Sequence, residues 1–378
     1  MKKVAIVVTT IFRLKFLQGY IDNINKYAKE DFEVKIFIIP DLKTPKDAVS
    51  QAFNATTSNS NGVFIEYLSL NEQRKFLSRL GEIGTYIHYN TDNRRNVGFL
   101  RALDWGCDIL ISIDDDNYAR LDEDFVGNHA QVGKIVELPV VNSSDNWVNI
   151  CESLVTDTNK SIYPRGFPFY ARDVEREVSF KRKKVFLAMN VGLWLHDPDV
   201  DSISRLTMLT RTVDFGGREF AIGLHANTPI NTQNTGMIRP VAAVYYYIPM
   251  GSHIRGLHLD RFGDIFSGYF VKKCIDSMGH YIKIGRPIVD HIRTPHDLFD
   301  DLHQELTGII ITEELTKFLA SFELSGSSYL GSYENLAIII GDFCEHTKDL
   351  QEDHFKKYFE YVSQAMLVWC KTVKMIGV

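Results

Sequence analysis

Three consecutive carboxylates are the residues of this chain best suited to chemistry. Asp114, Asp115 and Asp116, the acidic triplet, directly follow the apolar run ILISI. Such a run is typical of a parallel strand buried on both faces, and ligands of open α/β sheets gather at the carboxyl ends of such strands. Adjacent acids repel one another unless a cation neutralises them, which favours Mn²⁺ or Mg²⁺ that also holds phosphate oxygens. The alternative is an acidic turn in solvent.

The segments before the triplet alternate between strand-like and helix-like patterns. Strands are predicted at 4–8, 34–39 and 63–65, and helices at 16–28, 72–80 and 96–105. This alternation indicates an α/β fold with a doubly wound sheet. Because no glycine-rich phosphate loop occurs, phosphate would be held by a metal ion together with Arg or Lys. Residues 1–118 are therefore predicted to be a nucleotide-binding half.

Two further parts follow, with different patterns. Within residues 119–300, strands are expected at 192–195, 242–248 and 281–284, and a buried helix at 266–278. Residues 301–378 are helical in pattern, and an apolar stripe between Phe355 and Trp369 repeats at i, i+3, i+4 and i+7. We expect one catalytic domain over 1–300, with 119–300 binding sugar or acceptor, and a helical C-terminal region over 301–378. The stripe is either core or a subunit contact, and predicts a homo-oligomer.

Composition limits the classes of function. The formal net charge of −6 and the 24% of charged residues are ordinary for a globular protein and argue against a nucleic-acid partner, which would require a basic surface. The basic cluster at 181–184 is expected on a solvated turn. Five scattered cysteines give no disulfide framework, and no apolar run reaches the length of a transmembrane helix. We therefore expect a reduced, cytoplasmic protein without an integral membrane segment.

Six short motifs occur in the order in which one known family has them. They are PDLK at 40–43, SIDDD at 112–116, RGFPFYAR at 165–172, GLWL at 192–195 followed by Pro198-Asp199, RFGD at 261–264 and GRP at 285–287. With these motifs the chain resembles the plant reversibly glycosylated polypeptides, the UDP-arabinopyranose mutases, and through them the GT-A glycosyltransferases. The shared region runs from about residue 35 to about residue 315 and leaves the C-terminal helices outside.

The resemblance implies a metal and diphosphate site at the acidic triplet. Asp114 and Asp116 would bind Mn²⁺ or Mg²⁺, and Asp115 would help to bind the sugar diphosphate. His291 follows a predicted strand, and a late histidine often completes the metal shell in GT-A enzymes. The alternative for His291 is a hydrogen-bonded histidine of the surface or core.

The resemblance also implies four substrate-binding residues outside the triplet. Asp41 lies where the family's second strand ends near the nucleotide base. Arg95 begins an Arg-x-x-Gly-x-Leu stretch that would face the nucleotide. Arg165 and Arg261 each open one of the shared motifs and are expected to contact the UDP-sugar.

Two residues are candidates for catalysis. By resemblance, Arg172 matches the arginine that becomes reversibly glycosylated, and Asp264 is the base or the acid that binds an acceptor. Because arginine is protonated in water, a glycosylated Arg172 needs a low-dielectric pocket or a carboxylate, such as Asp264 or Asp173, to accept its proton. The alternative for Arg172 is a bidentate clamp on an anion, and for Asp264 a helix N-cap.

Three hypotheses about function follow. The leading one is a metal-dependent enzyme that, by resemblance, interconverts the pyranose and furanose forms of a UDP-sugar with reversible self-glycosylation. The second is a glycosyltransferase that moves the sugar to an external saccharide acceptor bound by residues 196–260. The third is a non-catalytic scaffold of the same fold, assembled through its C-terminal helices.

Overall fold

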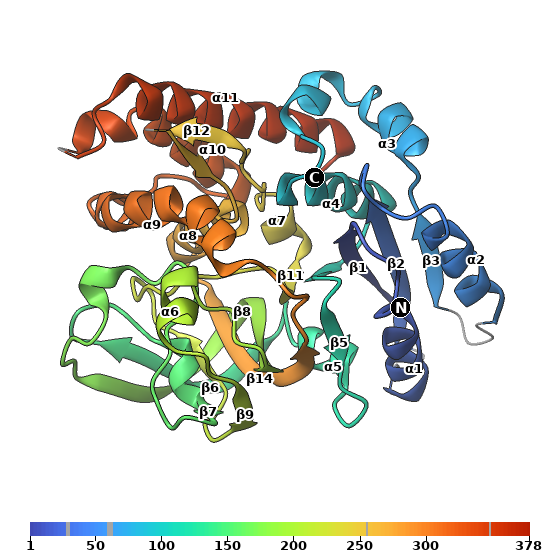
Figure 1. Cartoon of the computed structure of the whole chain (residues 1–378), viewed down its shortest axis with the longest axis horizontal. Coiled ribbons are helices and arrows are strands. Elements are labelled where there is room, and N and C mark those ends of the chain that lie inside the picture. Colours follow the sequence, from blue (N-terminus) through green and yellow to red (C-terminus); the bar gives the residue numbers. More distant parts are fainter. Residues whose placement is uncertain (28–30, 59–62, 255, 348) are drawn as a thin grey trace.

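One mixed sheet forms the centre of the computed structural model, which describes residues 1–27, 31–58, 63–254, 256–347 and 349–378 (Figure 1). Its strands lie in the order β3-β2-β1-β4-β11-β8-β6-β10-β14-β5, with β9 paired to β8, β7 paired to β9, and a separate β12-β13 hairpin. The strands are β1 (Lys2–Thr10), β2 (Phe32–Pro40), β3 (Phe64–Tyr67), β4 (Ile109–Ile113), β5 (Asn117–Ala119), β6 (Ile135–Ser143), β7 (Leu154–Thr156), β8 (Val178–His196), β9 (Thr212–Phe215), β10 (Phe220–Ile222), β11 (Asn234–Ile238), β12 (Ser252–Ile254), β13 (Leu257–Leu259) and β14 (Tyr281–His291).

Helices surround this sheet, and the long C-terminal ones stack at one end of the molecule (Figure 1). The α-helices are α1 (Leu17–Tyr27), α2 (Ala48–Ser58), α3 (Leu70–Leu77), α4 (Arg95–Trp105), α5 (Phe125–His129), α6 (Ser202–Thr207), α7 (Arg239–Ala242), α8 (Gly263–Ser277), α9 (Leu298–Ala320), α10 (Tyr329–Gly341) and α11 (Asp353–Ile376). The 3₁₀ turns are η1 (Gly81–Tyr86), η2 (Asp92–Arg94), η3 (Ile150–Ser153), η4 (Phe169–Ala171) and η5 (Phe343–His346). The predicted α/β class with a C-terminal helical extension is confirmed.

The parallel part of the sheet creates the crevice in which the site lies. β1 pairs in parallel with both β2 and β4, and residues Val4 to Val8 are buried, as their continuous apolar run predicts. The strand order reverses between β1 and β4, because β2 and β3 lie on one side and β11 on the other. At such a reversal the connections leave in opposite directions, and ligands bind at the carboxyl ends of the two strands.

Helix α4 packs against β1 and β2 through a glycine. A Cβ atom at Gly98 would overlap the side chains of Val7 and Ile39, so a larger residue would push the helix away from the sheet. Arg95 lies three positions earlier on the same helix face. The close packing therefore carries Arg95 to the ends of β1 and β4.

A buried polar network joins α5 to strands β8 and β11. With its proton on Nε2, His129 donates to Oδ1 of Asn234 at 2.9 Å and accepts at Nδ1 from Asn190 at 3.0 Å. Asn234 also donates to the carbonyl of Leu193 at 3.0 Å. Burial lowers the pKa of His129 to about 4, so the ring is neutral at pH 7. The network fixes β11 to β8, and β11 in turn pairs with β4, the strand that leads into the acidic triplet.

Two predictions for the middle of the chain are wrong. Residues 242–248 are not a strand: α7 ends at Ala242, and an irregular, buried segment containing Tyr245 follows. A short apolar run indicates burial without fixing the type of element, which explains this error. The basic cluster at 181–184 is exposed, but it lies in β8, where it pairs with β6, and not on a turn.

The apolar stripe of the last helix is core. Trp369 and Phe359 have no exposed surface, and the Trp369 indole donates to the carbonyl of Ala243 at 2.8 Å. The stripe therefore gives no support to self-association. All five cysteines are buried and unpaired. Among the described residues, no helix combines the length and apolar character that crossing a bilayer requires.

Candidate active site

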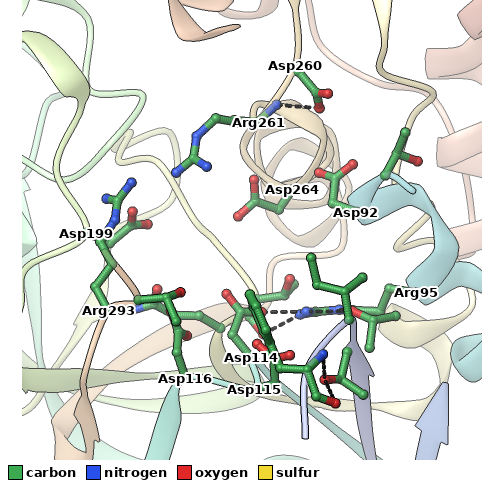
Figure 2. Close-up of a pocket in the computed structure, with 18 of the residues that line it drawn as sticks. Asp92, Arg95, Asp114, Asp115, Asp116, Asp199, Asp260, Arg261, Asp264 and Arg293 are labelled. Atoms are coloured by element: carbon green, nitrogen blue, oxygen red, sulfur yellow. Dashed lines mark hydrogen bonds and ion pairs between the residues drawn. The ribbon is translucent and has the colours of Figure 1, made fainter. Parts of the chain in front are cut away.

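A cavity of about 350 Å³ lies at the carboxyl ends of β1 and β4 (Figure 2). Its walls come from the segments after β1, β2, β4 and β14, from η2 and α4, and from the start of α8. Among the predicted site residues, it is lined by Asp41, Arg95, Asp114, Asp115, Asp116, Arg165, Arg261, Asp264 and His291. Arg172 does not line it. The structure therefore brings nine of the ten predicted residues into one cleft.

Arg95 joins the ends of the two central strands. Its Nη2 lies 2.5 Å from Oδ1 of Asp114, and its Nη1 donates to Oγ of Ser112 at 3.0 Å. It also donates to Oγ1 of Thr9 on β1 and to the hydroxyl of Tyr247. Arg95 is only 6% exposed. Its charge is thus held within the protein and directed at the first acid of the triplet.

The other two acids of the triplet have opposite electrostatic environments. Burial, together with the charges of Asp116 and Asp114, raises the pKa of Asp115 to about 7, despite a hydrogen bond from Thr10. Burial also acts to raise the pKa of Asp116, but His291, whose Nε2 lies 3.3 Å from Oδ2 of Asp116, lowers it. Burial acts to lower the pKa of His291, but Asp116 raises it. Nδ1 of His291 is hydrogen-bonded to the carbonyl of Asp197 at 2.6 Å.

The triplet and His291 suit a hard divalent ion in donor type and charge. Carboxylate oxygens are preferred by Mg²⁺ and Mn²⁺, and imidazole is a further ligand for a transition metal. In the described part of the chain, no three His, Cys, Asp or Glu side chains are already gathered as a metal shell. Burial, together with the charges of Asp116 and Asp114, raises the pKa of Asp115, and a bound cation would favour its ionised form. Asp114, Asp116 and His291 are the residues that would hold the ion.

Asp41 organises the end of β2. Its Oδ2 accepts a hydrogen bond from the backbone N–H of Asn90 at 2.6 Å, and its Oδ1 accepts one from Leu42 at 2.7 Å. These bonds connect the turn after β2 to the loop that leads into η2. Asp41 therefore shapes the wall of the cleft where the resemblance expects the nucleotide base.

A second charged group, the Arg165 cluster, is formed by Arg165, Asp199 and Asp264. Nε of Arg165 donates to Oδ1 of Asp199 at 2.9 Å, and Nη2 lies 3.2 Å from Oδ2 of Asp264. Burial raises the pKa of Asp264 despite Arg165. Burial also acts to raise the pKa of Asp199, but Arg165 lowers it far below the ordinary value. The cluster therefore contains one firmly ionised carboxylate and one with increased proton affinity, in contact with the same guanidinium.

Buried carboxylates of α9 hold two arginines of the cleft. Glu305 lies 3.0 Å from Nε of Arg261, and Asp301 lies 2.5 Å from Nη2 of Arg293. Arg261 has a φ of 61°, a left-handed conformation that is uncommon outside glycine. Figure 2 shows Arg261 extending into the cleft from above Asp264. The C-terminal region thus supports the wall of the site.

Arg172 is not among the residues that line the cleft, and other side chains and a carbonyl group bind its guanidinium. Its Nη2 lies 2.7 Å from Oδ2 of Asp201, and its Nη1 donates to Oγ of Ser204 at 3.2 Å. Nε and Nη2 donate to the carbonyl of Phe167, and the guanidinium stacks 3.8 Å from the ring centroid of Phe169. Every guanidinium nitrogen has a protein partner, so Arg172 fixes the 165–172 segment in this structure.

Four charged residues of the cleft were not selected from the sequence. They are Asp92, Asp199, Asp260 and Arg293. Asp199 is part of the shared motif Pro198-Asp199, and Arg293 lies two residues after His291, so both could have been found from the sequence. Asp260 directly precedes Arg261 and could have been found in the same way, whereas Asp92 belongs to none of the shared motifs and reaches the cleft through the fold.

Comparison with known proteins identifies the family. A model described as reversibly glycosylated polypeptide matches residues 67–378. The chain belongs to this family. The match includes α9, α10 and α11, so the expectation that the C-terminal helices lie outside the family region is wrong. The match begins at residue 67 and therefore leaves the PDLK motif at 40–43 outside the matched residues.

The individual relatives of this chain within the family are distant in sequence. Probable UDP-arabinopyranose mutase 4 of Arabidopsis thaliana is 25% identical over 294 residues, which is 77% of this chain and 73% of that protein. Two further relatives, one named as a UDP-arabinopyranose mutase and one as a probable one, align with this chain over about half of their own length, 53% and 52% respectively. A probable inactive UDP-arabinopyranose mutase 2 of Oryza sativa subsp. japonica is 23% identical over 44% of this chain and 46% of that protein.

One solved structure illustrates the structural similarity. Glucosyl-3-phosphoglycerate synthase from Mycobacterium tuberculosis, crystallised with Mn²⁺, UDP and glucosyl-3-phosphoglycerate, is 10% identical, with a TM-score of 0.39 over 83% of this chain and 80% of that chain. A similarity of this size carries no inference about activity.

Proposed function

We propose that this protein is a metal-dependent enzyme that interconverts the pyranose and furanose forms of a UDP-sugar. The observation that carries the proposal is a single cleft with two chemically different ends. One end has the acidic triplet and Arg95, which suit a divalent ion and a diphosphate. The other end has the Arg165 cluster, which suits the anomeric carbon of a sugar. The names of the relatives support a UDP-sugar as the substrate class.

At the diphosphate end, the residues of the chain are already oriented. Arg95 is fixed by β1 and β4, and its charge supports Asp114 before any ligand arrives. A bound Mn²⁺ or Mg²⁺ would neutralise charge on the diphosphate. Arg293, held by Asp301 on α9, adds a positive charge to the same cleft. Prepositioned charges of this kind need little reorganisation during reaction.

At the sugar end, we assign the covalent step to Arg165. One guanidinium nitrogen forms a bond to C1 of the sugar while the bond from C1 to the phosphate oxygen breaks, and its electron pair leaves with the diphosphate. The proton of that nitrogen passes to Asp264, whose Oδ2 lies 3.2 Å from Nη2 and whose pKa is raised by burial. Ring opening and closure through another hydroxyl then change the ring size, and the diphosphate returns to C1 as Asp264 returns the proton.

The covalent role thereby moves from Arg172, for which the resemblance suggested it, to Arg165. Arg165 lines the cleft and contacts a carboxylate of raised pKa, whereas Arg172 lies outside it and is bound by Asp201 and Phe167. Arg172 is proposed to be a positioning residue that holds the segment carrying Arg165. We retain Asp264 as the base.

A single incubation tests the proposal against its alternatives. The protein is mixed with UDP-arabinopyranose and Mn²⁺, and nucleotide sugars and intact protein mass are followed together. We expect UDP-arabinofuranose and a protein adduct of one pentosyl unit. Formation of product only when a saccharide is added would favour the glycosyltransferase. A folded protein that binds UDP and turns over nothing, with or without a saccharide, would favour the scaffold.

A further inference from the structure

Asp92 is an acid of the cleft that none of the steps above uses. It begins η2, the turn that leads into α4, and its side chain lines the cavity. Figure 2 shows its carboxyl group near Asp264, on the side of the cleft opposite the acidic triplet. Asp92 thus lies beside Asp264 of the Arg165 cluster, on the side of the cleft from which α4 and Arg95 begin.

The backbone of α8 leaves room for this carboxyl group. A Cβ atom on Gly263 would lie 2.5 Å from Oδ2 of Asp92 and 3.0 Å from Oδ1, closer than side-chain atoms pack. Only glycine at this position lets the carboxyl group rest against the first turn of α8. Asp92 and Asp264 therefore approach the same space from two different elements.

The surroundings of Asp92 favour its neutral form. Its Oδ1 is buried, and the described residues offer this atom no hydrogen-bond partner. In an ionised carboxylate this oxygen would carry negative charge with neither water nor a hydrogen-bond donor beside it, which is unfavourable. Burial, with the charges of Asp260 and Asp264 and against those of Arg95 and Arg165, raises the pKa of Asp92 to about 8. From α11, Tyr358 also faces this group.

We propose that Asp92 binds the sugar of the nucleotide sugar, and that it does so as a neutral carboxyl group that donates a hydrogen bond to a sugar oxygen. The inference rests on the proposed function, which defines the sugar end of the cleft. A neutral acid both donates and accepts, as a hydroxyl group does, whereas an ionised carboxylate only accepts. A sugar without the matching hydroxyl would leave the buried acid unpaired, so Asp92 contributes to sugar specificity.

Calorimetry on the full chain with Mn²⁺ at pH 7 tests this, using UDP and UDP-arabinopyranose as probes. Asp92→Ala removes the carboxyl group, and Asp92→Asn keeps its shape and a donor. We expect both variants to bind UDP within about twofold of wild type, which excludes misfolding. We expect Asp92→Ala to weaken UDP-arabinopyranose binding about tenfold or more, and Asp92→Asn to restore it to within a few-fold, in line with the loss of one hydrogen bond.

Two more variants make the result specific. Gly263→Ala should displace the carboxyl group and reproduce the Asp92→Ala loss, while Asp47→Ala, an exposed acid outside the cleft, should change neither affinity. Three results would each overturn the inference. The first is an equal loss of affinity for UDP and UDP-arabinopyranose, and the second is no loss of affinity in Asp92→Ala. The third is a loss of affinity in Asp92→Asn as large as in Asp92→Ala. Failure of wild type to bind UDP at all would instead refute the proposed function, and is seen before any variant is measured.

Discussion

Arg95 and Asp114 form an ion pair of 2.5 Å between Nη2 and Oδ1, at the point where the two central strands end. The same guanidinium donates to Thr9 on β1 and to Ser112 on β4. The pair is therefore part of the sheet as much as part of the cleft. Any change in Arg95 must alter both the fold and the charge of the acidic triplet.

We predict that Arg95→Ala lowers the free energy of unfolding by about 3–5 kcal/mol. The substitution removes the positive charge paired with Asp114 and leaves the other polar groups around it without their hydrogen-bond donor. Urea unfolding followed by circular dichroism measures this. Arg101→Ala is the matched control, since Arg101 lies on the same helix and forms partly exposed ion pairs with Asp104 and with Glu66 of β3. Its expected loss is about 1 kcal/mol or less. Similar losses in both variants would contradict a structural role for the Arg95 pair.

The acidic triplet should control metal-dependent nucleotide binding. We predict that the double variant Asp114→Asn, Asp116→Asn weakens Mn²⁺-dependent UDP binding by at least about 100-fold, because both proposed carboxylate ligands lose their charge. Calorimetry with and without Mn²⁺ measures this. Asp122→Asn, which changes an exposed acid paired with Arg120, should bind UDP as wild type does. An unchanged metal dependence in the double variant would remove the triplet from metal binding.

Trypsin can locate the sugar adduct, because a glycosylated arginine resists cleavage. An adduct on Arg165 would join SIYPR to GFPFYAR, giving a peptide over residues 161–172. An adduct on Arg172 would instead give a peptide over residues 166–176. We predict the first peptide, carrying one pentosyl mass, after incubation with UDP-arabinopyranose and Mn²⁺. The second peptide would return the covalent role to Arg172.

His129 should make the fold sensitive to mild acid. Its folded pKa of about 4 lies below the ordinary value of about 6.5, so the unfolded chain takes up the proton first as the pH falls. Its contribution is complete above about pH 6.5 and decreases toward pH 4. We predict that the titration of His129 alone lowers the free energy of unfolding by about 2 kcal/mol between pH 7 and pH 5.

The comparison that isolates this effect uses His129→Gln, which cannot take up a proton. Urea unfolding at several pH values should show a shallower pH dependence in His129→Gln than in wild type. His354→Gln, which changes an exposed histidine of α11, should keep the wild-type dependence. Parallel curves for wild type and His129→Gln would contradict the neutral, buried histidine.

The parallel half of the fold was predictable because local signals agreed there. The apolar runs of β1 and β4 end where polar residues begin, and this pattern is enough to place the acidic triplet at a sheet edge. In the middle of the chain the same signal failed. The run at 242–248 is buried without being a strand, because burial there comes from packing by distant helices such as α11.

Part of the cleft was also predictable, because short motifs in the sequence mark some of the residues that line it. Residues in short shared motifs, such as Arg165 and Asp264, could be selected from the sequence and do line it. Motif matching could not separate Arg165 from Arg172, since both stand in one motif and only tertiary contacts decide which faces the cavity. Asp92 depends on the space left by Gly263, a relation between two segments far apart in the chain.

The support that α9 gives to Arg261 and Arg293 also bears on how the protein is made. During synthesis, the acidic triplet leaves the ribosome long before Asp301 and Glu305 do. Until then, the two arginines have no buried carboxylates to hold them, and the nascent chain has only one finished wall of its cleft. This wall of the cleft is therefore completed late in translation, and a chain released before α9 would lack the carboxylates that hold Arg261 and Arg293 even with residues 1–118 folded.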